Sequence, residues 1–106
     1  MNRHYKKLLN ELFDTLDIDS SGFLDVRAFQ ALGEVMTGAP ISIPEATVQL
    51  KRADKDNDDM VSRIEWLEFS VMLMQLDEDT FTDVISDYIS KVKYYFEKKR
   101  RLISAH

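Results

Sequence analysis

Two acidic stretches of the chain place carboxylates at alternate positions. Residues 17–28 read DIDSSGFLDVRA, and residues 54–65 read DKDNDDMVSRIE. When the chain turns tightly, side chains spaced in this way point to one centre, and hard cations such as Ca²⁺ and Mg²⁺ prefer oxygen ligands. The chemistry that these stretches predict is therefore the binding of a hard cation. They differ at the last position, which is Ala28 in the first stretch and Glu65 in the second.

Apolar residues at helical spacing flank the first stretch. Before it, six residues recur three or four positions apart and predict one apolar helix face: Tyr5, Leu8, Leu9, Leu12, Phe13 and Leu16. After it, the helical period resumes at Val26 and continues through Phe29, Leu32 and Met36. Gly38, followed by Pro40, is a typical helix stop. The first stretch is thus predicted to connect two helices.

The second stretch has the same surroundings. Ser42 and Glu45 have the spacing of a capping box, and Pro44 needs no backbone donor in a first helical turn. We expect a short helix there, with Ala46, Leu50 and Ala53 facing inward. A very apolar helix is expected from about residue 63 to residue 76. The chain therefore repeats the unit helix, acidic loop, helix.

With these features, the chain resembles the EF-hand family over roughly residues 5–76. The family loop has twelve residues, with oxygen ligands at positions 1, 3, 5, 7, 9 and 12 and glycine at position 6. Position 8 is apolar in both loops, Leu24 and Val61, and an aromatic residue follows position 12, Phe29 and Trp66. The resemblance implies an all-α fold of paired helix-loop-helix units, a short β bridge between the loops, and calcium as the natural ligand.

For the second loop, the resemblance implies a ligand at every position. The expected oxygen donors are three aspartates, one carbonyl, one serine acting through water and a bidentate glutamate: Asp54, Asp56, Asp58, Met60, Ser62 and Glu65. The departure from the family is Asp59 in place of glycine. This position favours positive φ, which Asp tolerates better than most residues at a cost of about 1 kcal/mol. We expect weakened but retained binding.

The first loop keeps the glycine, Gly22, but lacks the closing ligand. Five residues at positions 1 to 9 can supply an oxygen, four through the side chain and the phenylalanine through its backbone carbonyl: Asp17, Asp19, Ser21, Phe23 and Asp25. Ala28 supplies nothing at position 12, which removes two of about seven oxygens. We therefore expect this loop to be weakly occupied or empty at physiological calcium.

The last part of the chain differs in charge. Acidic residues outnumber basic ones over residues 1–80, whereas basic residues outnumber acidic ones over residues 81–106. Apolar residues recur at helical spacing from Phe81 to Ile103, behind an acidic cap at residues 77–80. We expect an EF-hand pair over residues 1–76 and a long, basic, amphipathic helix over residues 77–106. Because the helix before it is apolar on several sides, the C-terminal helix is the candidate to cover it.

Three roles for the C-terminal helix are open. Its apolar face can lie in the groove of the two hands, as a target helix does. It can project and pair with a second copy or a larger, for example cytoskeletal, partner. The basic run KKRR at residues 98–101 can contact acidic lipid or nucleic acid, although cations at a solvated helix C-terminus have a simpler explanation in the helix dipole. We expect a protein partner or self-association, no nucleic acid and no membrane contact.

Composition excludes several function classes. The chain has no cysteine and two histidines, His4 and His106, and it shows no phosphate-binding loop or nucleophile elbow, so we expect no enzyme. Without a signal-like or membrane-spanning run, we expect a cytoplasmic, in part cytoskeleton-associated, protein. The predicted function is that of a calcium-binding regulatory or adaptor protein with one competent loop, at residues 54–65, which couples ion binding to the docking of a helix in a groove. The alternative is a structural or cytoskeletal module whose Ca²⁺ or Mg²⁺ serves stability. Methionines at 36, 72 and 74 suit either a sensor groove or a core.

Overall fold

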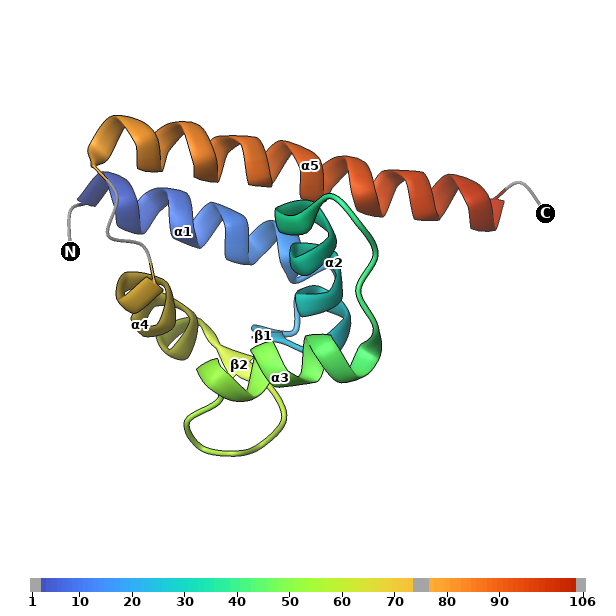
Figure 1. The fold of residues 1–106 in the computed structure, drawn as a ribbon, viewed down its shortest axis with the longest axis horizontal. Helices are drawn as coiled ribbons and strands as arrows, with labels where there is room; N and C mark the ends of the chain where they lie inside the picture. The colour runs from blue at the N-terminus through green and yellow to red at the C-terminus, as the bar shows by residue number, and fades with distance from the viewer. Residues whose placement is uncertain (1–2, 74–76, 105–106) are drawn as a thin grey trace.

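The computed structural model describes residues 3–73 and 77–104. Within them, five helices and two short strands follow in this order: α1 (Arg3–Leu16), β1 (Phe23–Leu24), α2 (Val26–Thr37), α3 (Ile43–Ala53), β2 (Val61–Ser62), α4 (Arg63–Leu73) and α5 (Glu78–Ser104). The predicted all-α fold with a short β bridge and a long C-terminal helix is confirmed (Figure 1). The acidic stretches are the connections inside two helix-loop-helix units. The expected end of the fourth helix at residues 74–76 lies outside the described residues.

The helix ends coincide with the signals in the sequence. Asp25 caps α2, and Gly38, at φ +78°, ends it. The Ser42 hydroxyl caps α3 by accepting a hydrogen bond from the Glu45 N–H at 3.3 Å. The Asp77 carboxylate accepts one from the Thr80 N–H at 3.0 Å at the start of α5. Each cap satisfies a backbone N–H that has no partner within its helix.

The two loops are joined by the strand pair. β1 and β2 run antiparallel, with Leu24 opposite Val61 and Phe23 opposite Ser62. Leu24 and Val61 are both buried, whereas Phe23 is 40% exposed. The bridge expected from position 8 of each loop is therefore present, and it fixes one loop against the other.

One hydrophobic core joins both units and α5. The predicted inward residues of α1 and α3 are buried, except Tyr5, which is partly buried against the core. Phe29 and Trp66 are also buried, and their rings meet edge to face with centroids 6.4 Å apart. The residues that α5 adds to this core lie on one face: Phe81, Ile85, Ile89 and Val92. The apolar face of the C-terminal helix thus packs within its own chain.

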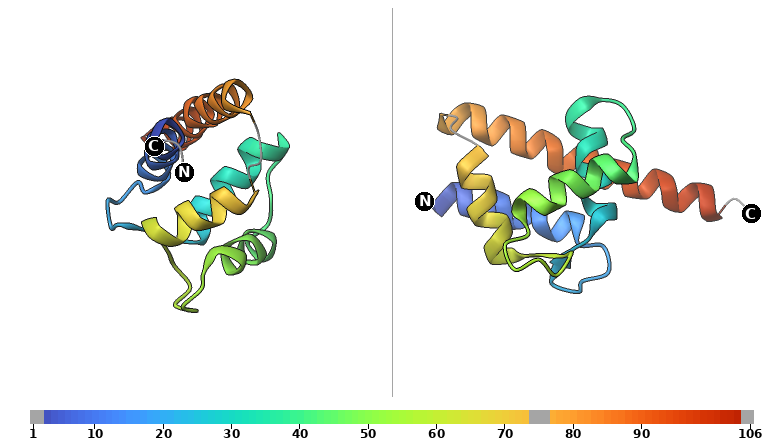
Figure 2. Two further views of the ribbon diagram at one scale, coloured as in Figure 1. Left: turned by 90° about the vertical axis from the view of Figure 1, so that its left-hand side faces the viewer. Right: turned by 60° about the horizontal axis from the view of Figure 1, so that its bottom comes forward.

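The position of α5 differs from the expected one. α5 packs along α1 and against α2 (Figures 1 and 2), whereas α4 packs against α1 and α3. The expectation that the C-terminal helix mainly covers α4 is wrong for the described residues. The apolar face of α1 is too broad for its own unit to cover, and Tyr5 on it stacks on Phe81 with ring centroids 4.2 Å apart. Ile64 on α4 is left 70% exposed.

The last turns of α5 extend past α2, so that the start of α1 and the end of α5 lie at opposite ends of the molecule (Figure 1). Lys98 and Lys99 are exposed there, and Lys99 lies over the ring of Tyr95 at 4.6 Å. The side chains of Arg100, Arg101 and Ile103 lie outside the described part. No described helix is both long and apolar enough to cross a membrane.

Candidate metal centre

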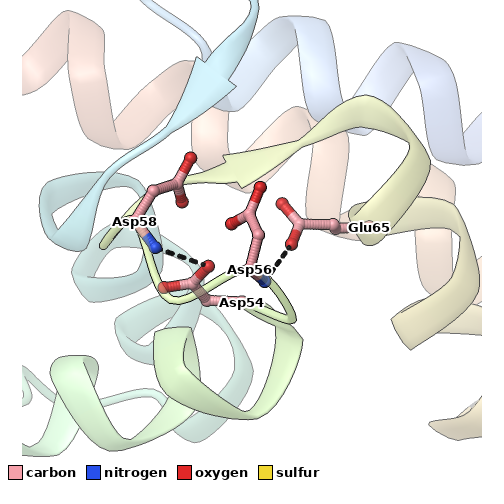
Figure 3. Close-up of side chains that lie close together, drawn as sticks. All are labelled: Asp54, Asp56, Asp58 and Glu65. Atoms are coloured by element: carbon pink, nitrogen blue, oxygen red, sulfur yellow. Dashed lines mark hydrogen bonds between the residues drawn. The ribbon is translucent and has the colours of Figure 1, made fainter.

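Four carboxylates converge inside the second loop (Figure 3). One oxygen from each of Asp54, Asp56, Asp58 and Glu65 lies within 4.8 Å of all the others. Asp54 ends α3, Asp56 and Asp58 belong to the loop, and Glu65 lies in the first turn of α4. The structure therefore brings together four of the six residues that the sequence singles out. The other two residues, Met60 and Ser62, lie where the same loop leads into α4, and Ser62 belongs to β2.

Asp54 organises the turn of the loop. Its side chain is fully buried and accepts hydrogen bonds from the N–H groups of Asp58 at 3.3 Å and Asp59 at 2.8 Å. Burial opposes its ionisation, but these donors outweigh burial and hold the pKa of Asp54 below its usual value. Asp17 makes the same contacts in the first loop, accepting from Ser21 at 3.1 Å and Gly22 at 2.9 Å. The two loops thus share one backbone geometry.

Glu65 is fixed by backbone donors on both carboxylate oxygens. Oε1 accepts from the Ser62 N–H at 2.9 Å, and Oε2 accepts from the Lys55 N–H at 2.8 Å. The Ser62 hydroxyl in turn accepts from the Glu65 N–H at 3.2 Å, which completes a capping box at the start of α4. Partial burial opposes ionisation, yet the donors lower the pKa of Glu65. The sequence analysis missed this box, although the spacing S-x-x-E in SRIE is its signal.

The side chain of Asp56 favours its protonated form, in which it can donate a hydrogen bond to the Asp58 carboxylate. The neighbouring carboxylate of Asp58 is the largest cause that raises the pKa of Asp56 to about 6, followed by desolvation and by Asp54. At neutral pH, several negative charges thus share a small volume, and a divalent cation would offset their repulsion. The donors are all oxygens and include a glutamate able to bind through both oxygens, which suits Ca²⁺ or Mg²⁺ and not a soft metal.

The residue at the sharp turn has the backbone that glycine normally supplies. Asp59 has φ +64°, and Asn57 has φ +59°. The Asp59 side chain pairs with the ammonium group of Lys51 on α3, and this contact raises the pKa of Lys51. The ammonium also donates to the Asn57 side chain at 3.1 Å. Sequence reasoning missed Lys51, because the contact depends on how the loop folds back onto α3.

The first loop keeps its shape but not a carboxylate cluster. Gly22 has φ +86° as expected, but the Ser21 hydroxyl donates to the Phe23 carbonyl at 3.1 Å. The Asp25 carboxylate caps α2 by accepting from the N–H groups of Arg27 and Ala28. Among the described residues, the first loop holds no group of three or more converging carboxylates, whereas the second loop holds four. Of the five donors expected in this loop, several are therefore committed to local hydrogen bonds.

A hollow of about 220 Å³ lies beside Ala28, at the position where a glutamate would close the first loop. Asp17 and Asp25 line it from the loop, and Phe96 lines it from α5. Met60 of the second loop also reaches it. The missing ligand thus leaves space, and the C-terminal helix borders that space.

The start of α4 is fastened to α1 by Arg63. Its guanidinium donates to Asp14 at 2.5 Å and to Asn10 at 2.9 Å, and it lies 4.4 Å from the centre of the Phe13 ring. These contacts join the second unit to the first one, two residues before Glu65. The first turn of α4 is therefore fixed by α1 as well as by the loop that precedes it.

An apolar groove of about 240 Å³ opens between α2, α3 and the body of α4. Phe29, Leu32, Ile41 and Phe69 line it, together with Met36, which is 51% exposed. The side chains of the other two methionines considered above, at 72 and 74, lie outside the described residues. Within the described residues, the groove is lined by one methionine and several aliphatic and aromatic side chains.

No protein-family model matches the chain, and no curated protein is significantly similar to it. The molecule is a small helical domain with a two-stranded antiparallel bridge between two loops, and one of these loops holds a carboxylate cluster that could bind a metal ion.

Proposed function

We propose that the protein is an EF-hand calcium-binding regulatory or adaptor protein, with one competent loop at residues 54–65 and a degenerate loop at residues 17–28. The observation that carries the proposal is the convergence of Asp54, Asp56, Asp58 and Glu65 within 4.8 Å. The paired helix-loop-helix units and the Leu24 to Val61 bridge support the family assignment. The proposed role is ion binding and not catalysis.

Calcium is the preferred ion because of the shape of the site. Ca²⁺ takes six to eight oxygens in flexible geometry, whereas Mg²⁺ requires a small octahedron and keeps several waters. Glu65 can supply two oxygens, and in this proposal the Met60 carbonyl and Ser62 would complete the set from the strand side of the loop. Magnesium would occupy the site at rest, with fewer protein ligands, and calcium would displace it.

Ion binding would act on α4 and on the apolar groove. Glu65 lies in the first turn of α4, so a pull on its carboxylate is a pull on that helix. The groove between α2, α3 and α4 would then widen and accept the apolar face of an amphipathic helix. The proposed partner is a protein helix in the cytoplasm, from a target, a cytoskeletal assembly or a second copy. Neither nucleic acid nor a membrane is part of the proposal.

A structural role is the second candidate, and it is favoured by the anchoring of α4. Arg63 is bound to Asp14 and Asn10, and the Trp66 indole donates to the Leu9 carbonyl at 2.9 Å. Both contacts would have to give way or move with α4 if the groove opened. In this alternative the ion adds stability without switching.

Fluorescence of a hydrophobic dye distinguishes the two roles. We expect calcium to increase dye binding to the wild type, because the groove opens, and magnesium to do so much less. The Glu65→Gln variant keeps the side-chain volume and should show no calcium response. If calcium raises the melting temperature of the wild type but leaves dye fluorescence unchanged, the structural role is correct and the regulatory one is wrong.

A further inference from the structure

Lys51 brings a positive charge of the protein itself to the edge of the carboxylate cluster. Its ammonium group pairs with Asp59, donates to the Asn57 side chain at 3.1 Å and lies 4.0 Å from Oδ2 of Asp54. Asp54 is one of the four converging carboxylates, and its side chain is fully buried. A group on α3 therefore lies close to the volume that a metal ion would enter.

The contacts of Lys51 fall on the two strained residues of the loop. Asn57 and Asp59 both have left-handed backbone angles, which cost a non-glycine residue free energy. Both side chains reach the same ammonium group, whereas neither contributes a carboxylate to the cluster. Lys51 thus supports the turn from outside the cluster, and Asp54 is the cluster carboxylate that its ammonium group approaches, at 4.0 Å.

We propose that Lys51 is a tethered counter-ion of the 54–65 loop, which stabilises the loop without metal and opposes the entry of a divalent cation. The proposal rests on the calcium site proposed above and adds the residue that sets its affinity. Lys51 is a positioning residue, because it acts on the ion through Asp59 and Asp54 and is not itself a ligand.

The expected size of the effect follows from Coulomb's law. A monovalent and a divalent cation about 6 Å apart in water repel by the equivalent of roughly a tenfold change in affinity. Salt screens this repulsion, because the Debye length near physiological ionic strength is about 8 Å. The removal of Lys51 should therefore strengthen calcium binding, and more so at low salt.

Lys55 provides a matched control. It is a lysine four residues after Lys51, inside the loop, and its ammonium group pairs with Glu68 on α4 and not with the cluster. Its side chain is 59% exposed, against 42% for Lys51. The substitutions Lys51→Met and Lys55→Met remove the same charge from the chain, so a difference between them measures the local contact.

The test is calcium calorimetry on the wild type and both variants at low and high salt, with thermal unfolding of the metal-free proteins. We expect Lys51→Met to raise calcium affinity about three- to tenfold at low salt and Lys55→Met to change it less than about twofold. We also expect Lys51→Met to lower the metal-free melting temperature. A residue with only a structural role would lower stability without raising affinity.

The Asp59→Asn background tests the tether. Without the Asp59 charge, Lys51 loses its closest charged partner and keeps only the Asn57 and Asp54 contacts. The further change Lys51→Met should therefore raise calcium affinity less than it does in the wild type. Equal responses of the two lysine variants, or weaker binding by Lys51→Met, would overturn the inference while the calcium site stands. If neither the wild type nor Lys51→Met binds calcium, the proposed function is overturned as well.

Discussion

The indole Nε1 of Trp66 donates a hydrogen bond to the backbone carbonyl of Leu9 at 2.9 Å. Trp66 directly follows Glu65 and is buried, so the residue beside the closing carboxylate of the second loop is fastened to α1 in the first unit. Phe29 holds the equivalent place after the first loop, and the two rings meet edge to face. The candidate metal loop is thus connected to the first unit through the side chain next to its closing carboxylate, in addition to Val61 and Arg63.

The first prediction concerns this anchor. Trp66→Phe removes the indole N–H that donates to the Leu9 carbonyl and removes part of a buried ring, so the free energy of unfolding should fall by about 2 kcal/mol. Urea unfolding followed by circular dichroism measures it. Tyr94→Phe, at a side chain that is 64% exposed, is the control and should change little. A Trp66→Phe protein as stable as the control would show that the anchor contributes nothing.

Arg63 gives a second prediction. Arg63→Lys cannot reproduce the fork that holds Asp14 and Asn10 or the contact with the Phe13 ring. Because Arg63 and Asp14 are 42% and 64% exposed, solvent screens the ion pair, and we expect a loss of about 1 kcal/mol in total. Lys91→Met breaks the exposed pair with Asp87 and is the matched control. An equal loss of stability in the two variants would contradict a specific role of the Arg63 contacts in joining α4 to α1.

The third prediction is a pH dependence of the metal-free protein. The pKa of Asp56 is raised to about 6 in the folded protein, so the folded state binds this proton more tightly than the unfolded state does. The protonated Asp56 therefore stabilises the fold fully below the unfolded pKa near 3.8, and this stabilisation is lost as pH rises through about 6. Asp56→Asn removes this loss. Its melting temperature should exceed that of the wild type at pH 7.5, and the difference should vanish near pH 4. A difference that does not change with pH would contradict the raised pKa.

Asp54 and Glu65 have lowered pKa values, and they act in the opposite direction. Their contribution is present above the unfolded pKa and is lost as pH falls through the lower folded value. The acid limb below about pH 4 should therefore remain in Asp56→Asn, which separates it from the Asp56 effect.

The fourth prediction restores the ligand that the first loop lacks. Ala28 lies beside a hollow of about 220 Å³ lined by Asp17 and Asp25, so Ala28→Glu has room for its side chain. We expect this variant to bind one more calcium ion per chain than the wild type in calorimetry, because a bidentate carboxylate closes the site. Ala28→Gln, of nearly equal volume and without charge, should gain none. An unchanged stoichiometry in Ala28→Glu would show that the missing carboxylate is not the defect.

Much of the fold could be predicted from the sequence because its signals are local. The helix faces follow from a period of three to four residues, and the stop at Gly38 follows from a glycine shortly before Pro40. The pairing of Leu24 with Val61 follows from equal positions in the two loops. The positive φ of Asp59 was also predicted, since a twelve-residue loop must turn at that point.

The remainder depended on tertiary packing. The choice of α5 between α4 and the α1 and α2 surface is decided by which apolar face is left uncovered, and sequence alone does not show this. The Lys51 contact to Asp59 and the Arg63 contact to Asp14 join residues whose approach is set by the fold. The capping box of Ser62 and Glu65 is the exception, because its spacing was visible and was read only as a pair of ligands.

The central claim is that one loop, and not two, binds calcium through the carboxylates that converge on Asp54 and Glu65. Calorimetric titration of the wild type with calcium, beside Glu65→Gln and Asp25→Asn, tests it most directly. Asp25→Asn is the control in the first loop, since asparagine still caps a helix. The account predicts one ion per wild-type chain, one for Asp25→Asn and none for Glu65→Gln. Two ions bound tightly by the wild type, or no binding at all, would contradict it.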